Sequence, residues 1–333
     1  MEQEIEVQKI RVSYPQDWPA YNLAQTNEKV MFKRLVSDLL EAVGEEKPPG
    51  AGRKGYGLRT KLFSLLLHAY TGKSSRRLIS ELKEAKLQGL VAEVPHFNSV
   101  LNFYDDDNLP ELLKQLITIT AKPLEQVEQD FAVDSSGFST LQYESWNNVR
   151  YSKHKEMRKF KKAHVMSGVK TNVITAVSVT RGVAHDSPEF IPLVRRTNKY
   201  FVIREVSADA AYSSRDNLQA VSDMGAVPFI TFRAGVTDKC RGAIVWKRMY
   251  QYFTEHREDF MEHYHKRSNA ETVFSMIKRK LGVKLRNMKE ISQENEILLK
   301  CLAHNIIVLI HEMYELKMGV NFNYCAGVVL KGE

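Results

Sequence analysis

The chain has 333 residues, of which 43% are hydrophobic and 26% charged, as in an ordinary globular protein with room for two domains. Its net charge of +8 suggests a polyanionic partner, because residues 139–162 alone sum to +5 and residues 264–290 to +6. No apolar run approaches membrane length, and the three cysteines lack zinc spacing, which argues against a membrane protein and a cysteine zinc site. We therefore expect a cytoplasmic protein that contacts no membrane and binds a nucleic acid.

Residues 1–128 are predicted to form a mainly α-helical N-terminal domain. Apolar residues recur at helical spacing before and after a linker near residues 45–57, which is rich in Pro, Gly and charge. A turn at residues 71–74 then leads into a third helix. Two helices joined in this way fit a helix-turn-helix that carries Arg76 and Arg77, although most helical hairpins bind no DNA. Binding of DNA ends by this domain is therefore a hypothesis.

Residues 129–318 are predicted to form an α/β domain, followed by a C-terminal tail at residues 319–333. The order of elements is β-β-β-α-β-α-β-α, with a hairpin turn near Asn172 and with Asp134 and Asp209 at the ends of two strands. This is the layout of the ribonuclease H-like fold, a mixed β-sheet flanked by helices. The expected strands cover residues 130–134, 163–170, 171–180, 201–207 and 226–232, and the later helices residues 214–224, 244–281 and 294–316.

Residues 264–278 are predicted to form one continuous helix, because they contain good helix formers and neither Pro nor Gly. On such a helix, Tyr264, Arg267, Glu271 and Lys278 fall within about 60° of one another. One carboxylate then lies between two cations, which suits a metal-binding acid beside a phosphate. The alternative is an ordinary basic surface helix.

Three acids, Asp134, Asp209 and Glu271, are the candidate metal ligands. Phosphodiester chemistry uses a pair of Mg²⁺ or Mn²⁺ ions, which activate the attacking oxygen and stabilise the leaving one. Mg²⁺ prefers a few carboxylates together with water and phosphate oxygens, so that three acids suffice. Taken alone, Asp134 is more often a turn residue. The nearby acids Asp130 and Asp186 are interpreted as structural.

Residues 143–162 interleave aromatic residues with cations. Cations can follow phosphates and aromatic rings can stack on unpaired bases, so we predict contact with DNA. A solvated basic loop with buried aromatic rings is the alternative. The cations assigned to DNA here are Arg158, Lys159, Lys161 and Lys162.

Over about residues 130–315, the chain resembles the insertion-sequence transposases of the DDE class. The acids match in Phe-Ala-Val-Asp-Ser-Ser-Gly-Phe around Asp134 and in Ala-Asp-Ala-Ala-Tyr around Asp209. The most specific match is the Tyr-Arg-Glu-Lys signature of one large transposase group, reproduced with its spacing by Tyr264, Arg267, Glu271 and Lys278.

The resemblance implies that the three acids hold divalent metals and that Arg267 and Lys278 contact phosphates near the scissile bond. Tyr264 would support the backbone or stack on a displaced base. The implied protein is a homodimer on double-stranded DNA that cuts at the terminal inverted repeats of its element and joins the 3′-hydroxyl ends to target DNA. Some relatives insert a β domain between the second Asp and the Glu, but here only 61 residues lie between them.

Two other functions are compatible with the same sequence. One is a metal-dependent nuclease of the same fold that cleaves without strand transfer. The other is a transposase-derived DNA-binding protein that has lost catalysis, against which the presence of all three acids argues.

Overall fold

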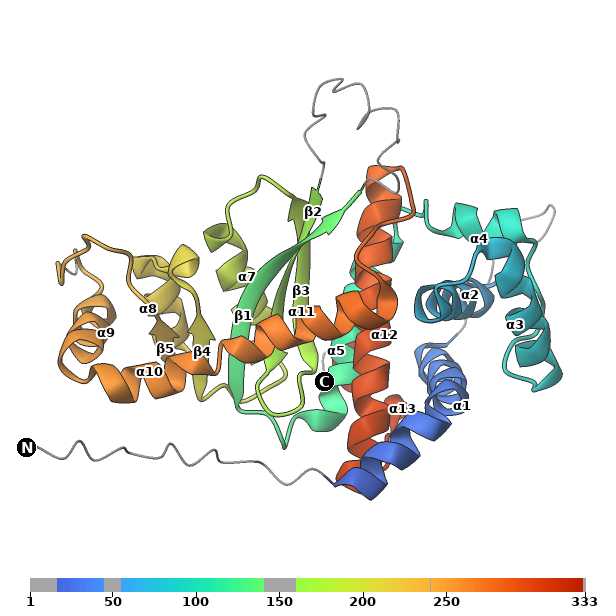
Figure 1. Cartoon of the computed structure of the whole chain (residues 1–333), viewed down its shortest axis with the longest axis horizontal. Coiled ribbons are helices and arrows are strands. Elements are labelled where there is room, and N and C mark those ends of the chain that lie inside the picture. The colour runs from blue at the N-terminus through green and yellow to red at the C-terminus, as the bar shows by residue number, and fades with distance from the viewer. Residues whose placement is uncertain (1–16, 45–54, 141–159, 240, 332–333) are drawn as a thin grey trace, which may run out of the picture.

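A five-stranded β-sheet forms the centre of the computed structural model, which describes residues 17–44, 55–140, 160–239 and 241–331 (Figure 1). The strand order is β3-β2-β1-β4-β5. β2 runs antiparallel to β1 and β3, whereas β4 runs parallel to both β1 and β5. This order, with one reversed strand, confirms the predicted ribonuclease H-like fold. The strands are β1 (Asp130–Ser139), β2 (Phe160–Gly168), β3 (Ile174–Arg181), β4 (Glu205–Ala208) and β5 (Val227–Ile230).

The predicted hairpin is present between β2 and β3. Asn172 occupies its turn with a φ of 64°, in the left-handed region that Asn tolerates better than most residues. The side chain of Asn305 on α12 (Glu290–Glu315) then accepts a hydrogen bond from the backbone N–H of Ile174, at 2.8 Å. The start of β3 is thus tied to a helix far away in the sequence.

β1 is longer than predicted, because it does not end at Asp134. The first residues of β1 pair in parallel with β4. On its other side, β1 pairs antiparallel with β2, and this pairing continues to Ser139. Asp134 therefore lies inside the strand, at the point where pairing with β4 stops. Since Val133 pairs with Ala208, the next residues along the two strands, Asp134 and Asp209, are neighbours.

The N-terminal region is helical, as predicted. α2 ends at Thr71 and is capped by Gly72, whose φ of 60° is left-handed and whose N–H donates to the carbonyl of His68, so that the chain turns into α3. Ser74 is the N-cap residue of α3, although its side chain makes no capping hydrogen bond. The helices are α1 (Trp18–Val43), α2 (Leu58–Thr71), α3 (Ser75–Leu87), α4 (Phe97–Phe103) and α5 (Leu109–Ala121).

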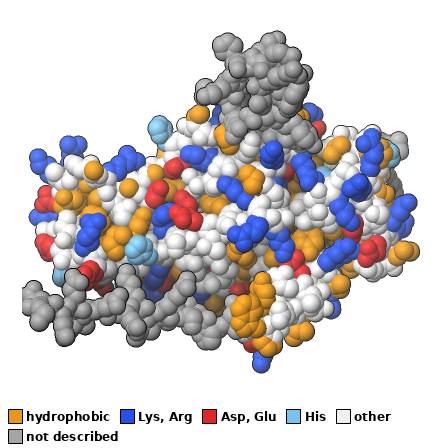
Figure 2. All heavy atoms as spheres, viewed as in Figure 1, with side chains coloured by type: hydrophobic (Ala, Val, Ile, Leu, Met, Phe, Trp, Pro, Cys, Tyr) orange, Lys and Arg blue, Asp and Glu red, His pale blue; other side chains and the backbone are white. Residues whose placement is uncertain are grey.

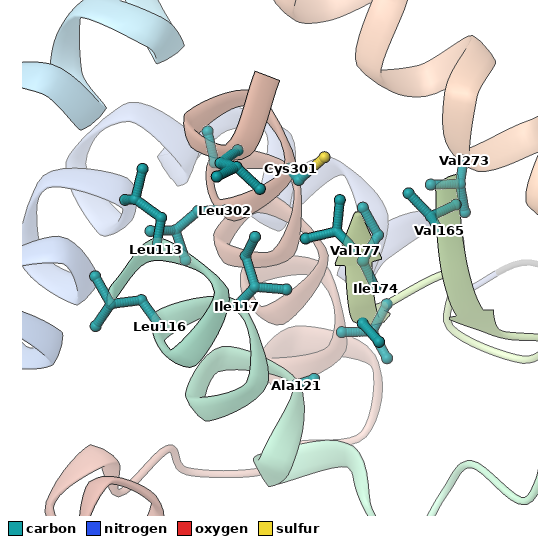
Figure 3. Packing of buried hydrophobic residues seen from close by; sticks show 14 of the residues in the cluster. Leu113, Leu116, Ile117, Ala121, Val165, Ile174, Val177, Val273, Cys301 and Leu302 are labelled. Atoms are coloured by element: carbon teal, nitrogen blue, oxygen red, sulfur yellow. The ribbon is translucent and has the colours of Figure 1, made fainter. Parts of the chain in front are cut away.

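α12 packs against α1, α2, α5 and β3, and so joins the N-terminal helices to the sheet. Figure 3 shows this core, in which Leu113 of α5 lies close to Leu302 of α12, and Ile117 of α5 lies between Leu302 and the β3 side chains Ile174 and Val177. α12 is long and apolar enough to cross a membrane, but 78% of its apolar window is buried, as expected of a core helix.

The predicted tail contains a further helix, α13 (Phe322–Lys331), which packs against α1 and α5. Its side chains Phe322, Cys325 and Ala326 are buried in the same hydrophobic cluster as the N-terminal helices and the sheet. This cluster therefore extends on both sides of the predicted boundaries at residues 128 and 318.

The remaining helices flank the sheet. α7 packs against β2 and β3, and α8 against β5, while α10 contacts β4 and β5. α11 crosses in front of β1 and β2 and leads towards α12 (Figure 1). These helices are α7 (Ser187–Asn198), α8 (Arg215–Asp223), α9 (Ile244–Glu255), α10 (Arg257–His265) and α11 (Ser268–Leu281).

The prediction of one continuous helix over residues 264–278 is wrong, because α10 ends at His265 and α11 begins at Ser268. Between them the hydrogen bonds tighten to the spacing of a 3₁₀ turn, with Arg267 N donating to Tyr264 O and Ala270 N to Arg267 O. No Pro or Gly marks this turn. The contacts that accompany it are tertiary, since the Lys266 side chain reaches across to the sheet.

Candidate active site

Three acidic residues from β1, the end of β4 and α11 interact at one place on the sheet. The Asp134 side chain is only 15% exposed, whereas that of Glu271 is 55% exposed. Burial raises the pKa of Asp134 to about 6, and the carboxylates of Asp209 and Glu271 act in the same direction. A backbone hydrogen bond at Ser135 and the charge of Arg267 oppose this rise. The structure thus brings the three predicted acids within electrostatic reach of one another.

Arg267 lies between two of these acids. Its Nη2 is 2.6 Å from Glu271 Oε1, and its Nη1 is 4.0 Å from Asp134 Oδ2. Its guanidinium also lies 5.7 Å from the centre of the Tyr264 ring. Tyr264, Arg267 and Glu271, three members of the signature, therefore lie together, as expected of residues on one face of a helix, even though the helix that was predicted to align them is interrupted.

Lys278, the fourth member, approaches the same acids from the last turn of α11. Its Nζ donates a hydrogen bond of 2.5 Å to Ser136 Oγ on β1 and lies 5.4 Å from the centre of the Phe138 ring. Burial lowers the pKa of Lys278, while the charge of Asp134 works against this shift. The site thus combines three acids with two partly buried cations.

The donors present suit a hard divalent cation. Carboxylate oxygens are the ligands that Mg²⁺ and Mn²⁺ prefer, and a cation would relieve the repulsion felt by Asp134. Within the part of the chain that the structure describes, no three His, Cys, Asp or Glu side chains are grouped closely enough to hold an ion. Glu271 is instead paired with Arg267, and it would exchange this contact for a metal.

The predicted cations of the basic segment are only partly described. Lys161 Nζ lies 3.8 Å from Glu290 Oε2, and Lys162 Nζ lies 2.8 Å from Asp186 Oδ1. Asp186 is the N-cap residue of α7, but its side chain makes no capping hydrogen bond. It instead accepts a hydrogen bond from Lys162 and balances the charge of that lysine. The predictions for Arg158 and Lys159 lie outside the described residues.

Arg76 and Arg77 are exposed in the first turn of α3, and the Arg76 guanidinium lies 4.7 Å from the centre of the Phe97 ring. A groove of about 670 Å³ runs beside them, lined by the α2–α3 turn, α4 and the segment that follows α11. Across this groove, Arg286 Nη1 donates to the carbonyl of Lys73, at 3.0 Å. Figure 2 shows Lys and Arg side chains gathered over this end of the molecule and the end of α11 that approaches it.

Lys266 and Glu205 were not among the predicted site residues. Lys266 Nζ binds Asp130 Oδ2, at 2.9 Å, and also Glu205 Oε1. The sequence contains a signal for the two acids that Lys266 binds. Asp130 lies four residues before Asp134, and Glu205 lies four residues before Asp209. Residues four apart on a strand share a face of the sheet.

A sheet of this order, with two neighbouring aspartates and a helix-borne glutamate at one site, defines a ribonuclease H-like domain of the DDE type. Residues 125–306, more than half of the chain, match the family described as the transposase DDE domain, and the chain belongs to this family. Among solved structures, it is similar to the piggyBac transposase in a cryo-EM synaptic complex with hairpin DNA. That likeness has 10% identity and a TM-score of 0.39, over 90% of this chain and 78% of the other. No curated protein matches the sequence.

Proposed function

We propose that this protein is a DNA transposase that binds the terminal inverted repeats of its own mobile element, cleaves there and joins the 3′-hydroxyl ends to target DNA. The observation that supports this most directly is the meeting of Asp134, Asp209 and Glu271 beside Arg267. Membership of the transposase DDE-domain family supports the same reading.

Asp134, Asp209 and Glu271 would hold two Mg²⁺ or Mn²⁺ ions. When bound, such ions supply an activated oxygen nucleophile and stabilise the leaving oxygen of an in-line displacement. Arg267 and Lys278 would bind the phosphates next to the scissile bond, since both are cations that already lie beside Asp134 or β1. Tyr264 would support the backbone of the DNA or stack on a displaced base.

The duplex outside the cleavage site would lie along the basic groove beside α3. Lys284 and Arg286 line this groove, and the exposed Arg76 and Arg77 follow Ser74 and Ser75 at its α3 side. Lys161 and Lys162 would contribute less than an unpaired cation, because Glu290 and Asp186 already offset their charge. We place the protein in the cytoplasm, as a homodimer when it is bound to DNA.

Cleavage of a duplex that carries the element end tests this proposal. In Asp134→Asn, Asp209→Asn and Glu271→Gln, cleavage in Mg²⁺ or Mn²⁺ should fall by about three orders of magnitude, or roughly 4 kcal/mol. End binding in the absence of metal should stay within a few-fold. Glu262→Gln, which changes an exposed acid on α10, is the matched control and should cleave normally. Near-normal cleavage by any of the three variants would remove that acid from the site.

A joining assay then separates the proposed transposase from its two alternatives. A wild-type protein that cleaves ends but never joins them to a second duplex would be a nuclease of the same fold. One that binds ends and cleaves none would be a non-catalytic derivative. The three acids at one site favour the two enzymes over the third possibility.

A further inference from the structure

Two pairs of acids lie along β1 and β4, four residues apart: Asp130 and Asp134 on β1, and Glu205 on β4 with Asp209 directly after its end. Asp130 and Glu205 are partners in the parallel pairing of these strands, and Asp134 and Asp209 lie four residues further along each. All four therefore lie on the same face of the sheet, with the two pairs separated by about 13 Å at 3.3 Å per residue. Two consecutive cations face these acids: Lys266 binds both members of the first pair, and Arg267 lies 4.0 Å from Asp134 of the second.

The first pair of acids forms a closed network of ion pairs with its surroundings, which we call the anchor cluster: Asp130, Glu205, Lys266, Arg204 and His263. Lys266 Nζ binds both acids, and the guanidinium of Arg204 donates to both Asp130 oxygens, at 2.8 and 2.5 Å. His263 Nδ1 lies 2.7 Å from Glu205 Oε2. Both acids are nearly buried, with side chains 8% and 6% exposed.

Lys266 and Asp130 of the anchor cluster favour their charged forms, although burial opposes this. Burial alone would lower the pKa of Lys266, but hydrogen bonds to Glu205 and Asp130 outweigh it and raise that pKa. Burial would likewise raise the pKa of Asp130, but hydrogen bonds from Arg204 and Lys266 lower it. Because Lys266 and Arg204 bind the acids of the anchor cluster, Arg267 is left to Asp134 and Glu271.

The anchor cluster holds the turn between α10 and α11 against the sheet. The ring of His263 stacks on that of Phe229 in β5, with centres 4.3 Å apart and planes 6° apart. Lys266 follows three residues later and Arg267 immediately after it, within hydrogen-bonded turns that leave little freedom between them. Fixing the Lys266 side chain therefore fixes the direction of the first turn of α11, which carries Glu271.

We propose that Lys266 is a positioning residue, which by binding Asp130 and Glu205 holds the α10–α11 turn so that Arg267 and Glu271 lie against Asp134. This proposal rests on the proposed function, because it assigns the anchor cluster to the same cleavage site. A buried ion pair that serves stability alone is the competing explanation.

The chain offers a matched control for that explanation. Lys280 lies near the other end of α11 and pairs with Glu28, whose side chain is 7% exposed, as buried as the acids of the anchor cluster. Both lysines thus bind buried carboxylates from the same segment, and both replacements remove a cation from acids that keep other partners: Arg204 and His263 in the anchor cluster, and the Tyr70 hydroxyl at Glu28. Only Lys266 is next to Arg267.

The test compares Lys266→Met, Lys266→Arg and Lys280→Met with the wild-type chain. All are assayed for thermal melting, for binding of an element-end duplex in EDTA, and for single-turnover cleavage at saturating duplex well below the lowest melting temperature. Both Met variants should melt earlier and bind DNA within about threefold of wild type. Cleavage by Lys266→Met should fall about 100-fold, as a displacement of about 1 Å can cause, while Lys280→Met stays within a few-fold. Lys266→Arg should recover part of the rate, since the charge and donors are kept.

Equal cleavage by Lys266→Met and Lys280→Met would overturn the proposal. If Lys266→Met does not fold, the triple variant that adds Asp130→Asn and Glu205→Gln removes the two buried acids that have lost the lysine. Wild-type cleavage by that folded variant would also overturn it. A wild-type chain that cleaves nothing would contradict the proposed function instead. In that case the crystal structure of Lys266→Met tests the positioning role. Arg267 should no longer contact Asp134 and Glu271 in that structure. Retention of both contacts would refute the positioning role.

Discussion

At the scale of single residues, substitutions of Arg267 and Lys278 distinguish between two interpretations of α11: part of a catalytic site, or a solvated helix surface. Arg267→Gln and Lys278→Gln should each lower single-turnover cleavage by one to three orders of magnitude, at about 1.4 kcal/mol for each tenfold in rate. Lys278→Arg should restore more activity than Arg267→Lys, because a planar guanidinium can bind two oxygens at once and an ammonium cannot.

The control for this prediction is Arg279→Gln, which removes the exposed cation next to Lys278 in sequence. It should cleave as well as the wild-type chain, and thermal melting in parallel excludes unfolding as the cause of any loss. Full activity in both Arg267→Gln and Lys278→Gln would show that these cations do not touch the reacting phosphates.

His304 makes the free energy of unfolding depend on pH. Its Nε2 bonds to the carbonyl of Asn172, at 2.9 Å, and burial lowers its pKa from 6.5 to about 4. The unfolded chain therefore binds a proton at His304 more readily than the folded chain does. The contribution of neutral His304 to the free energy of unfolding is fully present above pH 6.5. It is lost as the pH falls from 6.5 to 4, by at most about 3 kcal/mol.

His304→Gln keeps a donor for Asn172 and cannot titrate. Urea unfolding at pH 7, 5.5 and 4.5 should therefore show a steeper loss of stability in the wild-type chain than in this variant. Parallel losses in the two proteins would mean that His304 does not hold its neutral form.

At the scale of elements, the sequence predicts what local pattern determines and misses what tertiary contacts determine. The β-rich runs are visible as patterns, and so are Asp134 and Asp209, which the pairing of β1 with β4 makes neighbours. The break before Ser268 is not visible, because the contacts at Lys266 come from β1 and β4. The extension of β1 to Ser139 likewise depends on pairing with β2, which no local pattern reveals.

Asn305 is another residue whose role only the packing reveals. It lies fully buried in the apolar helix α12, where its Nδ2 donates to the carbonyls of Ile174 and Ile117, at 2.7 and 3.2 Å, and its Oδ1 accepts from Ile174 N. Asn305→Leu removes these partners and leaves buried backbone groups of β3 and α5 unpaired. At roughly 1–3 kcal/mol for an unsatisfied group, we expect a loss of about 3 kcal/mol or more.

The midpoint of urea unfolding measures this loss. Asn102→Leu, the same change at an exposed position of α4, is the control and should alter the free energy of unfolding by less than about 0.5 kcal/mol. Equal midpoints for the two variants would show that the Asn305 amide does not support the junction of α12, α5 and β3.

At the scale of the whole molecule, the sequence indicates two domains, and the hydrophobic cluster of the described residues extends across both of them through α12. A break in composition near residues 45–57 is local and easily read, but the packing of α1 on α12 connects residues far apart in the chain. The basic groove beside α3 is consequently held in a fixed position relative to α11. DNA that follows this groove would meet the site acids without a rearrangement of the two regions.

This arrangement predicts which cations carry the salt dependence of DNA binding. Arg76 and Arg77 face solvent, so that Arg76→Gln together with Arg77→Gln should flatten the dependence of log K on log[salt] by about 0.9 for each lost phosphate contact, or about 1.8 in all. Lys162→Gln should change the slope much less, because Asp186 already neutralises that charge. The slopes come from binding of an element-end duplex between 50 and 300 mM salt, without divalent metal. A larger effect of Lys162→Gln than of the paired arginine change would place the duplex over the start of β2 and away from the groove beside α3.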